Sequence, residues 1–189
     1  MSSDKILTKD EQKYLLALAR NVISMAAEGR EFYDPKFFSS SLQKKLGAFV
    51  TLHKNSHLCG CIGYVEGIKP LQTAVVEMAH SAAFKDPRFN PVGREDVPAL
   101  EIEISVLSPL KEINDVEEIK VGKHGIIIER DIYKGLLLPQ VAVEYNWDRE
   151  TFLIHTCIKA GLAEDAWQDK STKIKIFTAE IFSEKDNKE

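Results

Sequence analysis

Apolar residues recur along this chain at spacings that predict both helices and strands. After a capping box over Thr8–Glu11, apolar positions repeat at helical spacing until Gly29, which indicates a first helix with one buried face. Pro70 begins a second helical pattern that runs to Phe84. A weaker helical stretch is predicted over Ser41–Leu46.

Strand patterns fill most of the remaining chain. Ala48–His53 and Leu58–Val65 are joined by a turn-like segment, which predicts a hairpin, and Leu100–Ser108 alternates apolar and polar residues as a half-buried strand does. The other predicted elements are a hairpin of Ile126–Glu129 and Leu136–Leu138, a polar link after Pro139–Ala142, a helix over Arg149–Lys159 ending at Ala160-Gly161, and a closing strand over Lys173–Phe182. Helices and strands mix without strict alternation, so the predicted class is α+β with mainly antiparallel sheets.

Composition narrows the class of protein. The 189 residues suit a single domain over 1–189 or a domain with an inserted lobe, and 44% hydrophobic with 29% charged residues is typical of a globular protein. A net charge of −4 disfavours a nucleic-acid partner. The polar start Met1–Lys5 lacks the apolar core of a signal peptide, and no apolar run reaches the roughly 18 residues of a membrane span. We therefore expect a cytoplasmic protein without a membrane partner.

The segment Leu58–Tyr64 places two of the three cysteines one residue apart between glycines. In a regular strand the Cα atoms of Cys59 and Cys61 would lie about 6.6 Å apart, near the upper limit for a disulfide. His57, Cys59 and Cys61 would share one face, but they would spread over about 13 Å, too far for one ion without a bend. We therefore predict reduced thiols, no metal site and no cofactor.

The same segment resembles the signature hexapeptide of the AMMECR-type domain family, at Leu58-Cys59-Gly60-Cys61-Ile62-Gly63. Further matches follow in the family's order: Asp86-Pro87-Arg88-Phe89, His124-Gly125, Gly135–Ala142 and Cys157–Leu162. The resemblance implies an α+β fold of two lobes with a cleft. The larger lobe would come from both chain ends, the smaller from a middle segment, and the signature strand would lie near the cleft.

The family carries no established activity that could be transferred. Some relatives are fused to, or encoded beside, a Memo-type protein and a radical S-adenosylmethionine enzyme, so the resemblance implies these two as partners in a shared pathway. The sequence departs from the family at Cys59, where an arginine is usual. A guanidinium there would bind an anion, so an anion-binding role for that position is in doubt in this chain.

The candidate chemistry centres on Cys61. A nucleophilic cysteine needs a nearby base or cation, which His124, His57 or Arg88 would supply if the fold brought them together. The alternative for Cys61 is a small buried cysteine in a glycine-rich strand against which another backbone packs closely. His124 has an unperturbed pKa near neutrality and suits a general base, or it is a turn residue bonded to the backbone.

The remaining candidate residues would line the cleft. Gly60 and Gly63 would give a floor made of backbone, and Asp86, Arg88 and Gln140 a polar wall. Asp86 and Arg88 have an alternative role as an ion pair that stabilises their loop, and the Gln140 amide has one as a structural hydrogen-bonding group.

Two functions remain open. The first is an enzyme or pathway component with Cys61 as nucleophile and His124 as its base. The second is a non-enzymatic binding or adaptor domain that recognises a peptide, a small molecule or a partner protein. The absence of a complete acid–base or metal motif motivates the second hypothesis.

Overall fold

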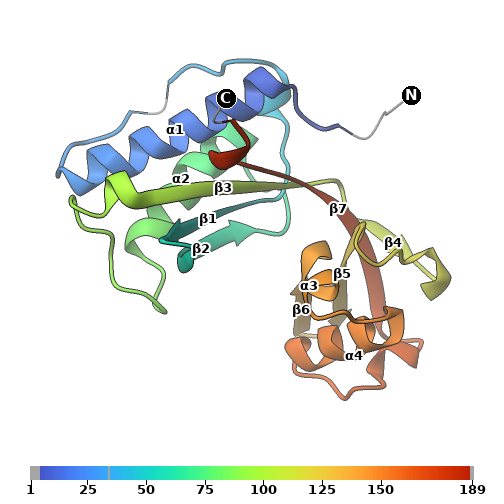
Figure 1. Cartoon of the computed structure of the whole chain (residues 1–189). Coiled ribbons are helices and arrows are strands. Elements are labelled where there is room, and N and C mark those ends of the chain that lie inside the picture. Colours follow the sequence, from blue (N-terminus) through green and yellow to red (C-terminus); the bar gives the residue numbers. More distant parts are fainter. Residues whose placement is uncertain (1–4, 34, 188–189) are drawn as a thin grey trace. The chain divides into compact units, whose positions relative to one another are not determined.

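A computed structural model of the chain describes residues 5–33 and 35–187 and has an α+β fold with antiparallel strands (Figure 1). The residues divide into two compact units, Met1–Leu107 with Glu180–Glu189, and Ser108–Ala179. The predicted class is therefore confirmed. Most of the polar start at Met1–Lys5 lies outside the described residues. No helix in the described part is both long and apolar enough to cross a membrane.

The first unit begins with α1, Lys9–Ala27, whose start follows the predicted capping box. Thr8 Oγ1 accepts a hydrogen bond from the Glu11 main chain, and the Glu11 carboxylate accepts one from the Thr8 main chain. Gly29 follows the helix end with φ +70°, a left-handed conformation that glycine adopts without steric cost. The predicted start and stop signals are both confirmed.

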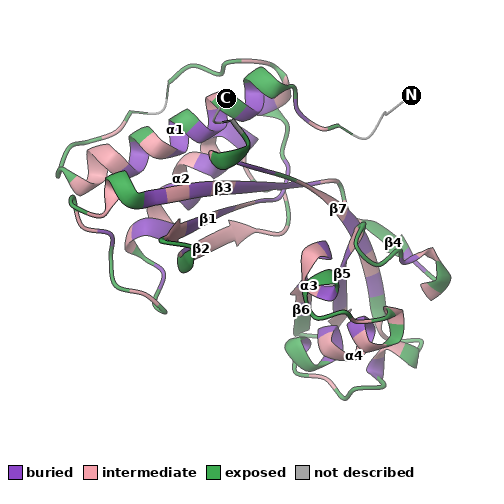
Figure 2. Cartoon of the chain, in the orientation of Figure 1, coloured by how far each residue is buried: buried purple, intermediate pink, exposed green. Residues whose placement is uncertain are grey.

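Three strands of the first unit are neighbours in the order β2-β1-β3: β1 (Ala48–Lys54), β2 (His57–Tyr64) and β3 (Leu100–Leu107). All pairs are antiparallel, and the predicted hairpin of β1 and β2 is confirmed. Helix α2, Leu71–Phe84, begins directly after Pro70. Alternate residues of β1 and β3 join α1 and α2 in one core, including Val50, Leu52, Ile102 and Ile104 (Figure 2).

Both ends of the described chain contribute to this unit. The Glu180 carboxylate accepts hydrogen bonds from the main-chain amides of Ile6 and Leu7, and the Arg20 guanidinium pairs with Glu184. Glu180 and Glu184 flank the end of β7 (Lys173–Ser183), whose earlier residues belong to the second unit. The last strand therefore fastens the beginning of the chain.

The second unit surrounds a core of its own, in which Ile126, Ile128, Phe152, Cys157 and Ile176 are buried. β7 pairs with β5 (His124–Arg130) and with the short β4 (Lys111–Ile113), and β5 pairs in turn with β6 (Tyr133–Leu137). Two helices follow β6, α3 (Pro139–Glu144) and α4 (Arg149–Ala160). Within the described residues, single-turn 3₁₀ helices lie at Ser41–Gln43, Val97–Ala99, Val116–Glu118, Ala166–Gln168 and Lys185–Asn187.

The structure departs from the predicted elements in three places. The weak helical stretch at Ser41–Leu46 is only a 3₁₀ turn over Ser41–Gln43, because Lys44 already has an extended backbone. No helix is predicted for Pro139–Ala142, which instead begins α3, since proline at the first helical position needs no hydrogen bond from its nitrogen. The strand β4 is three residues long, too short for alternation to reveal it.

Candidate functional site

The signature segment forms β2, the edge strand of the first unit's sheet. The Cys61 main-chain N–H donates to Asp86 Oδ2 at 2.9 Å, and the Cys61 carbonyl accepts from Arg88 Nη2 at 2.9 Å. An edge strand normally leaves such groups open to pairing with another chain. Here the Asp86–Arg88 segment, which follows α2, forms hydrogen bonds with both the main-chain N–H and the carbonyl of Cys61.

Asp86 and Arg88 hold each other in a bidentate ion pair. Arg88 Nε donates to Asp86 Oδ1 at 2.9 Å and Arg88 Nη2 to Oδ2 at 2.7 Å. The Asp86 side chain is 1% exposed, whereas that of Arg88 is 56% exposed. The hydrogen bonds from Arg88 hold the pKa of Asp86 well below its usual range. This is the ion pair that one of the two hypotheses for these residues predicts, and a role in orienting a substrate stays a prediction.

The two glycines of the signature lie against the chain's own atoms. A Cβ on Gly60 would lie 2.1 Å from the Ala82 carbonyl oxygen of α2. A Cβ on Gly63 would lie 2.3 Å from the Phe49 ring, which covers this glycine from β1. The absence of side chains here lets a helix and an aromatic ring approach the strand. Close packing of the protein's own atoms therefore explains both glycines.

A β-bulge lies at Cys59, the first cysteine of the signature. Leu52 pairs with Gly60 and His53 with Leu58, so Cys59 is an extra residue on β2. Cys59 Sγ donates to the Leu52 carbonyl at 3.4 Å and packs against the core of the first unit. The regular spacing assumed for His57, Cys59 and Cys61 is therefore wrong. Among the described residues no group of three or more His, Cys, Asp or Glu side chains is placed to hold a metal.

Cys61 is half-buried, and its sulfur lies 3.3 Å from Thr51 Oγ1 on the neighbouring strand. Glu103 of β3 is paired with Thr51 on the other side, so a thiol, a hydroxyl and a carboxylate occupy one row across the sheet. Burial raises the pKa of the Cys59 thiol and of the Cys157 thiol. Cys157 is fully buried in the second unit, in line with core packing.

His124 and Gln140 belong to the second unit. His124 is the first residue of β5, and its Nδ1 accepts a hydrogen bond from the Lys120 main chain at 3.2 Å. Burial and the neighbouring Lys123 lower the pKa of His124. The amide oxygen of Gln140, in the first turn of α3, is buried without a hydrogen-bond partner in the described part of the chain. Both side chains thus have their own local surroundings, and a pairing of His124 with Cys61 stays a prediction.

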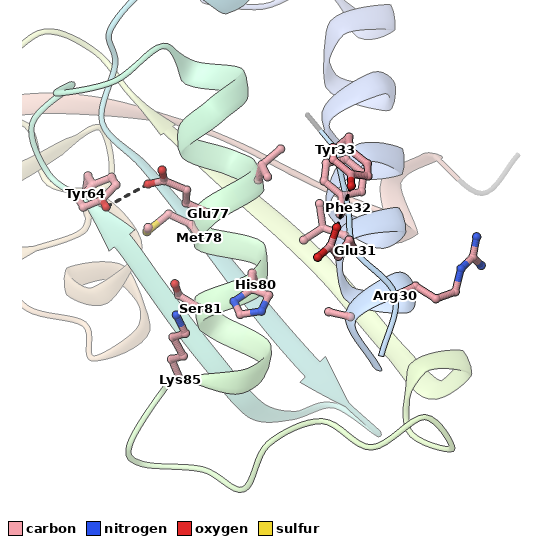
Figure 3. A pocket seen from close by; sticks show the side chains of 13 residues that line it. Arg30, Glu31, Phe32, Tyr33, Tyr64, Glu77, Met78, His80, Ser81 and Lys85 are labelled. Carbon is pink, nitrogen blue, oxygen red and sulfur yellow. Dashed lines mark hydrogen bonds between the residues drawn. The ribbon is translucent and has the colours of Figure 1, made fainter. Parts of the chain in front are cut away.

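A pocket of about 560 Å³ lies beside α2 within the first unit (Figure 3). Val22 and Ala26 of α1, Phe32 after its end, and Val76 and Met78 of α2 give it an apolar surface. The volume lies within the roughly 300–1,000 Å³ of small-molecule sites. The pocket adjoins the signature, because Tyr64 at the end of β2 is part of its wall.

Polar groups of α2 and of the segment after α1 also line this pocket. The Glu77 carboxylate pairs with Lys69 and accepts a hydrogen bond from Tyr64 Oη at 3.3 Å, and Tyr33 Oη donates to Glu31 at 2.7 Å. In Figure 3 the side chains of Ser81 and Lys85 lie close together, with His80 on the adjoining face of the helix, and all three line the pocket.

The sequence patterns do not predict this pocket, although they contain one signal of it. Glu77, Ser81 and Lys85 follow one another at spacings of four residues, which places them on one face of the predicted helix. Such a polar stripe is ordinarily read as the solvated face of an amphipathic helix. Only the structure shows that the Arg30–Tyr33 segment and these side chains line the same cavity.

A family model, AMMECR1, matches residues 16–182. The chain belongs to the AMMECR1 family. It is similar to an uncharacterized protein of Pyrococcus horikoshii, whose crystal structure superposes with a TM-score of 0.88 at 43% sequence identity and covers 95% of this chain and 94% of that one. A Pyrococcus furiosus protein is 47% identical over 93% of this chain and 90% of its own length. A Methanothermobacter thermautotrophicus protein is 43% identical over 94% and 96%. The AMMECR1 family resemblance is confirmed, and with it the α+β fold.

Proposed function

We propose that the first unit is a binding module, and that the pocket beside α2 takes a small organic ligand. The observation that carries the proposal is the composition of the pocket, about 560 Å³ with an apolar surface from α1 and α2 and polar groups along one helix face. Ligand sites typically combine apolar walls with a small number of placed polar groups. Of the two functions that the sequence leaves open, this proposal takes the non-enzymatic binding domain and places its ligand in the pocket beside α2.

The polar residues of the signature region are less suited to hold a ligand. Every oxygen of the Asp86 carboxylate already accepts hydrogen bonds from the chain itself, and the Arg88 guanidinium is directed at Asp86 and the Cys61 carbonyl. A ligand that took these groups would have to replace bonds that fix the edge of the sheet. The groups of His80, Ser81 and Lys85 carry no such structural bonds among the contacts described.

Filling the pocket is expected to abolish ligand binding while the fold is kept. In the Ala26→Phe variant the new ring occupies the apolar part of the pocket, whereas in the matched control Ala27→Phe the ring is added one residue further along α1, outside the lining. A fragment library is screened against the full-length protein by saturation-transfer NMR. We expect fragments that bind the wild type and Ala27→Phe, and lose at least about tenfold in affinity for Ala26→Phe. Fragments that bind Ala26→Phe as well as the wild type would refute the pocket as the site.

A second function is favoured by one observation, the half-buried thiol of Cys61 beside the Thr51 hydroxyl. In this hypothesis Cys61 is the nucleophile of an enzyme and His124 its base. The Memo-type and radical S-adenosylmethionine partners implied by the family resemblance fit either function as pathway neighbours, and they stay predictions.

The three cysteines are expected to react with iodoacetamide in a fixed order. Cys61 should be alkylated first, Cys59 more slowly because burial raises its pKa, and Cys157 only after unfolding because it is fully buried. Adducts are located by peptide mass spectrometry after limited labelling at neutral pH, with Cys61→Ser as the control for site assignment. Alkylation of Cys157 as fast as Cys61 in the folded protein would exclude Cys61 as a distinctive nucleophile.

A further inference from the structure

We propose that the ligand of the pocket is an organic carboxylate, with its acidic group against Lys85 and Ser81 at the end of α2 and its apolar body against Phe32 and Met78. This inference rests on the proposed binding function and adds the class of ligand. It follows from the charges that line the pocket, from the polarity of the helix end and from the distribution of apolar surface.

The acidic side chains of the pocket already have partners in the chain itself. Glu77 pairs with the Lys69 ammonium and accepts a hydrogen bond from the Tyr64 hydroxyl, and Glu31 accepts a hydrogen bond from the Tyr33 hydroxyl. The charge of Glu77 therefore needs no cationic ligand to balance it. A cation in the pocket would also have to compete with Lys69 for Glu77.

The hydrogen-bond donors at the end of α2, Lys85 and Ser81, have no such partners among the described residues. Lys85 is exposed and its ammonium makes no ion pair with the described residues, and Ser81 Oγ makes no hydrogen bond with them. Burial and the Lys85 charge lower the pKa of His80, which favours the neutral ring, and a neutral ring offers one N–H as a further donor. An ammonium with two neutral donors suits a single acidic group.

The position at a helix end favours a carboxylate over a phosphate. Lys85 is the residue that follows the last turn of α2, where the main-chain carbonyls carry a partial negative charge. Only part of this charge is balanced locally, through the bond from the Lys85 N–H to the Ser81 carbonyl. A dianionic phosphate would be repelled more strongly than a monoanionic carboxylate. Anion sites that bind phosphate ordinarily use the opposite end of a helix.

The rest of the lining fits an apolar body. Phe32 packs against the core from the segment after α1, Met78 is buried on α2, and Val22 and Val76 complete a surface without charged groups. A methionine adapts its shape to an aromatic partner and makes favourable sulfur–ring contacts. An aromatic or branched aliphatic acid therefore matches both parts of the pocket.

The test uses a matched pair of probes, 2-naphthoate and 2-naphthalenemethanol, which share the ring system and differ in the acidic group. Affinities for the full-length protein are measured by ligand-observed NMR titration. We expect the acid to bind about tenfold more tightly than the alcohol, which is the effect of one hydrogen-bonded charge pair. Lys85→Met should remove most of that preference, Lys85→Arg should keep it, and the exposed control Lys13→Met should not change it.

The outcomes separate this inference from the proposed function. Equal binding of acid and alcohol that is still lost in Ala26→Phe would overturn the carboxylate inference and leave the pocket as a binding site. Tighter binding of 2-naphthyl phosphate than of 2-naphthoate would overturn the choice of carboxylate. Binding of neither probe would overturn the carboxylate inference alone, and binding that Ala26→Phe does not weaken would overturn both.

Discussion

Replacing Gly60 with alanine is expected to lower the free energy of unfolding by about 3 kcal/mol or more, because the new methyl group meets a main-chain atom. The Cβ would lie 2.1 Å from the Ala82 carbonyl oxygen and 3.0 Å from its carbon. Relief requires α2 to move away from β2, and that movement would disturb the core that α2 shares with β1 and β3. The effect is read from urea unfolding followed by circular dichroism.

Two controls isolate the cause of this loss. In Gly93→Ala the atoms nearest the new methyl group are the carboxylate end of the Glu95 side chain, which can swing away, so we expect less than about 1 kcal/mol. Adding Ala82→Gly to Gly60→Ala should not restore stability, since the close atom is the carbonyl oxygen and not the methyl group of Ala82. A loss for Gly60→Ala no larger than that for Gly93→Ala would contradict the close packing of helix on strand.

Removing the Asp86 carboxylate is expected to cost about 3 kcal/mol of stability. Asp86→Ala leaves the Cys61 N–H without its acceptor and frees the Arg88 guanidinium from its bidentate partner. Arg88→Ala should cost less, since the Arg88 side chain is 56% exposed and the Cys61 amide keeps its bond to Asp86. Unfolding of the two variants in urea gives the comparison. A larger loss for Arg88→Ala than for Asp86→Ala would contradict the role assigned to the carboxylate.

The pH dependence of stability checks the same contact. The pKa of Asp86 is lower in the folded protein than its ordinary value of 3.8, so the charged form stabilises the fold. That stability is fully present above about pH 4 and is lost as the pH falls below 3.8 toward the folded pKa. Asp86→Asn, which cannot titrate, should therefore lose less stability than the wild type between pH 4 and pH 2. Parallel losses in the two proteins would contradict the lowered pKa.

Much of the fold could be predicted from the sequence because local rules decide it. The capping box at Thr8 and the alternation of Leu100–Leu107 each depend on residues a few positions apart. The bulge at Cys59 could not be predicted, since one extra residue in a strand leaves no signal in alternation when cysteines and glycines surround it. The bulge places Cys59 against the core. It also breaks the regular strand spacing on which the distances for a disulfide or a metal site at His57, Cys59 and Cys61 depend.

The candidate site was harder to predict because it depends on contacts between distant residues. The sequence motifs contain Cys61, Asp86 and Arg88, and the structure brings these three together in hydrogen bonds that hold the edge strand of the sheet. Nothing in the sequence tells whether a carboxylate 25 residues away bonds to a main-chain amide or to a ligand. The sequence does not predict the pocket, because its lining combines the Arg30–Tyr33 segment with residues of α2. The polar residues of α2 among them resemble an ordinary solvated helix surface.

The central claim is that a ligand contacts the pocket beside α2, whereas the Asp86–Arg88 segment fastens the signature strand. It is tested most directly by titrating 2-naphthoate into ¹⁵N-labelled full-length protein and following the amide chemical shifts. We predict that the largest changes fall on Ala26, Phe32, Ser81 and Lys85, and that Thr51 and Cys61 change little. Changes centred on Thr51, Cys61 and Arg88, with Ala26 and Ser81 unaffected, would contradict the account.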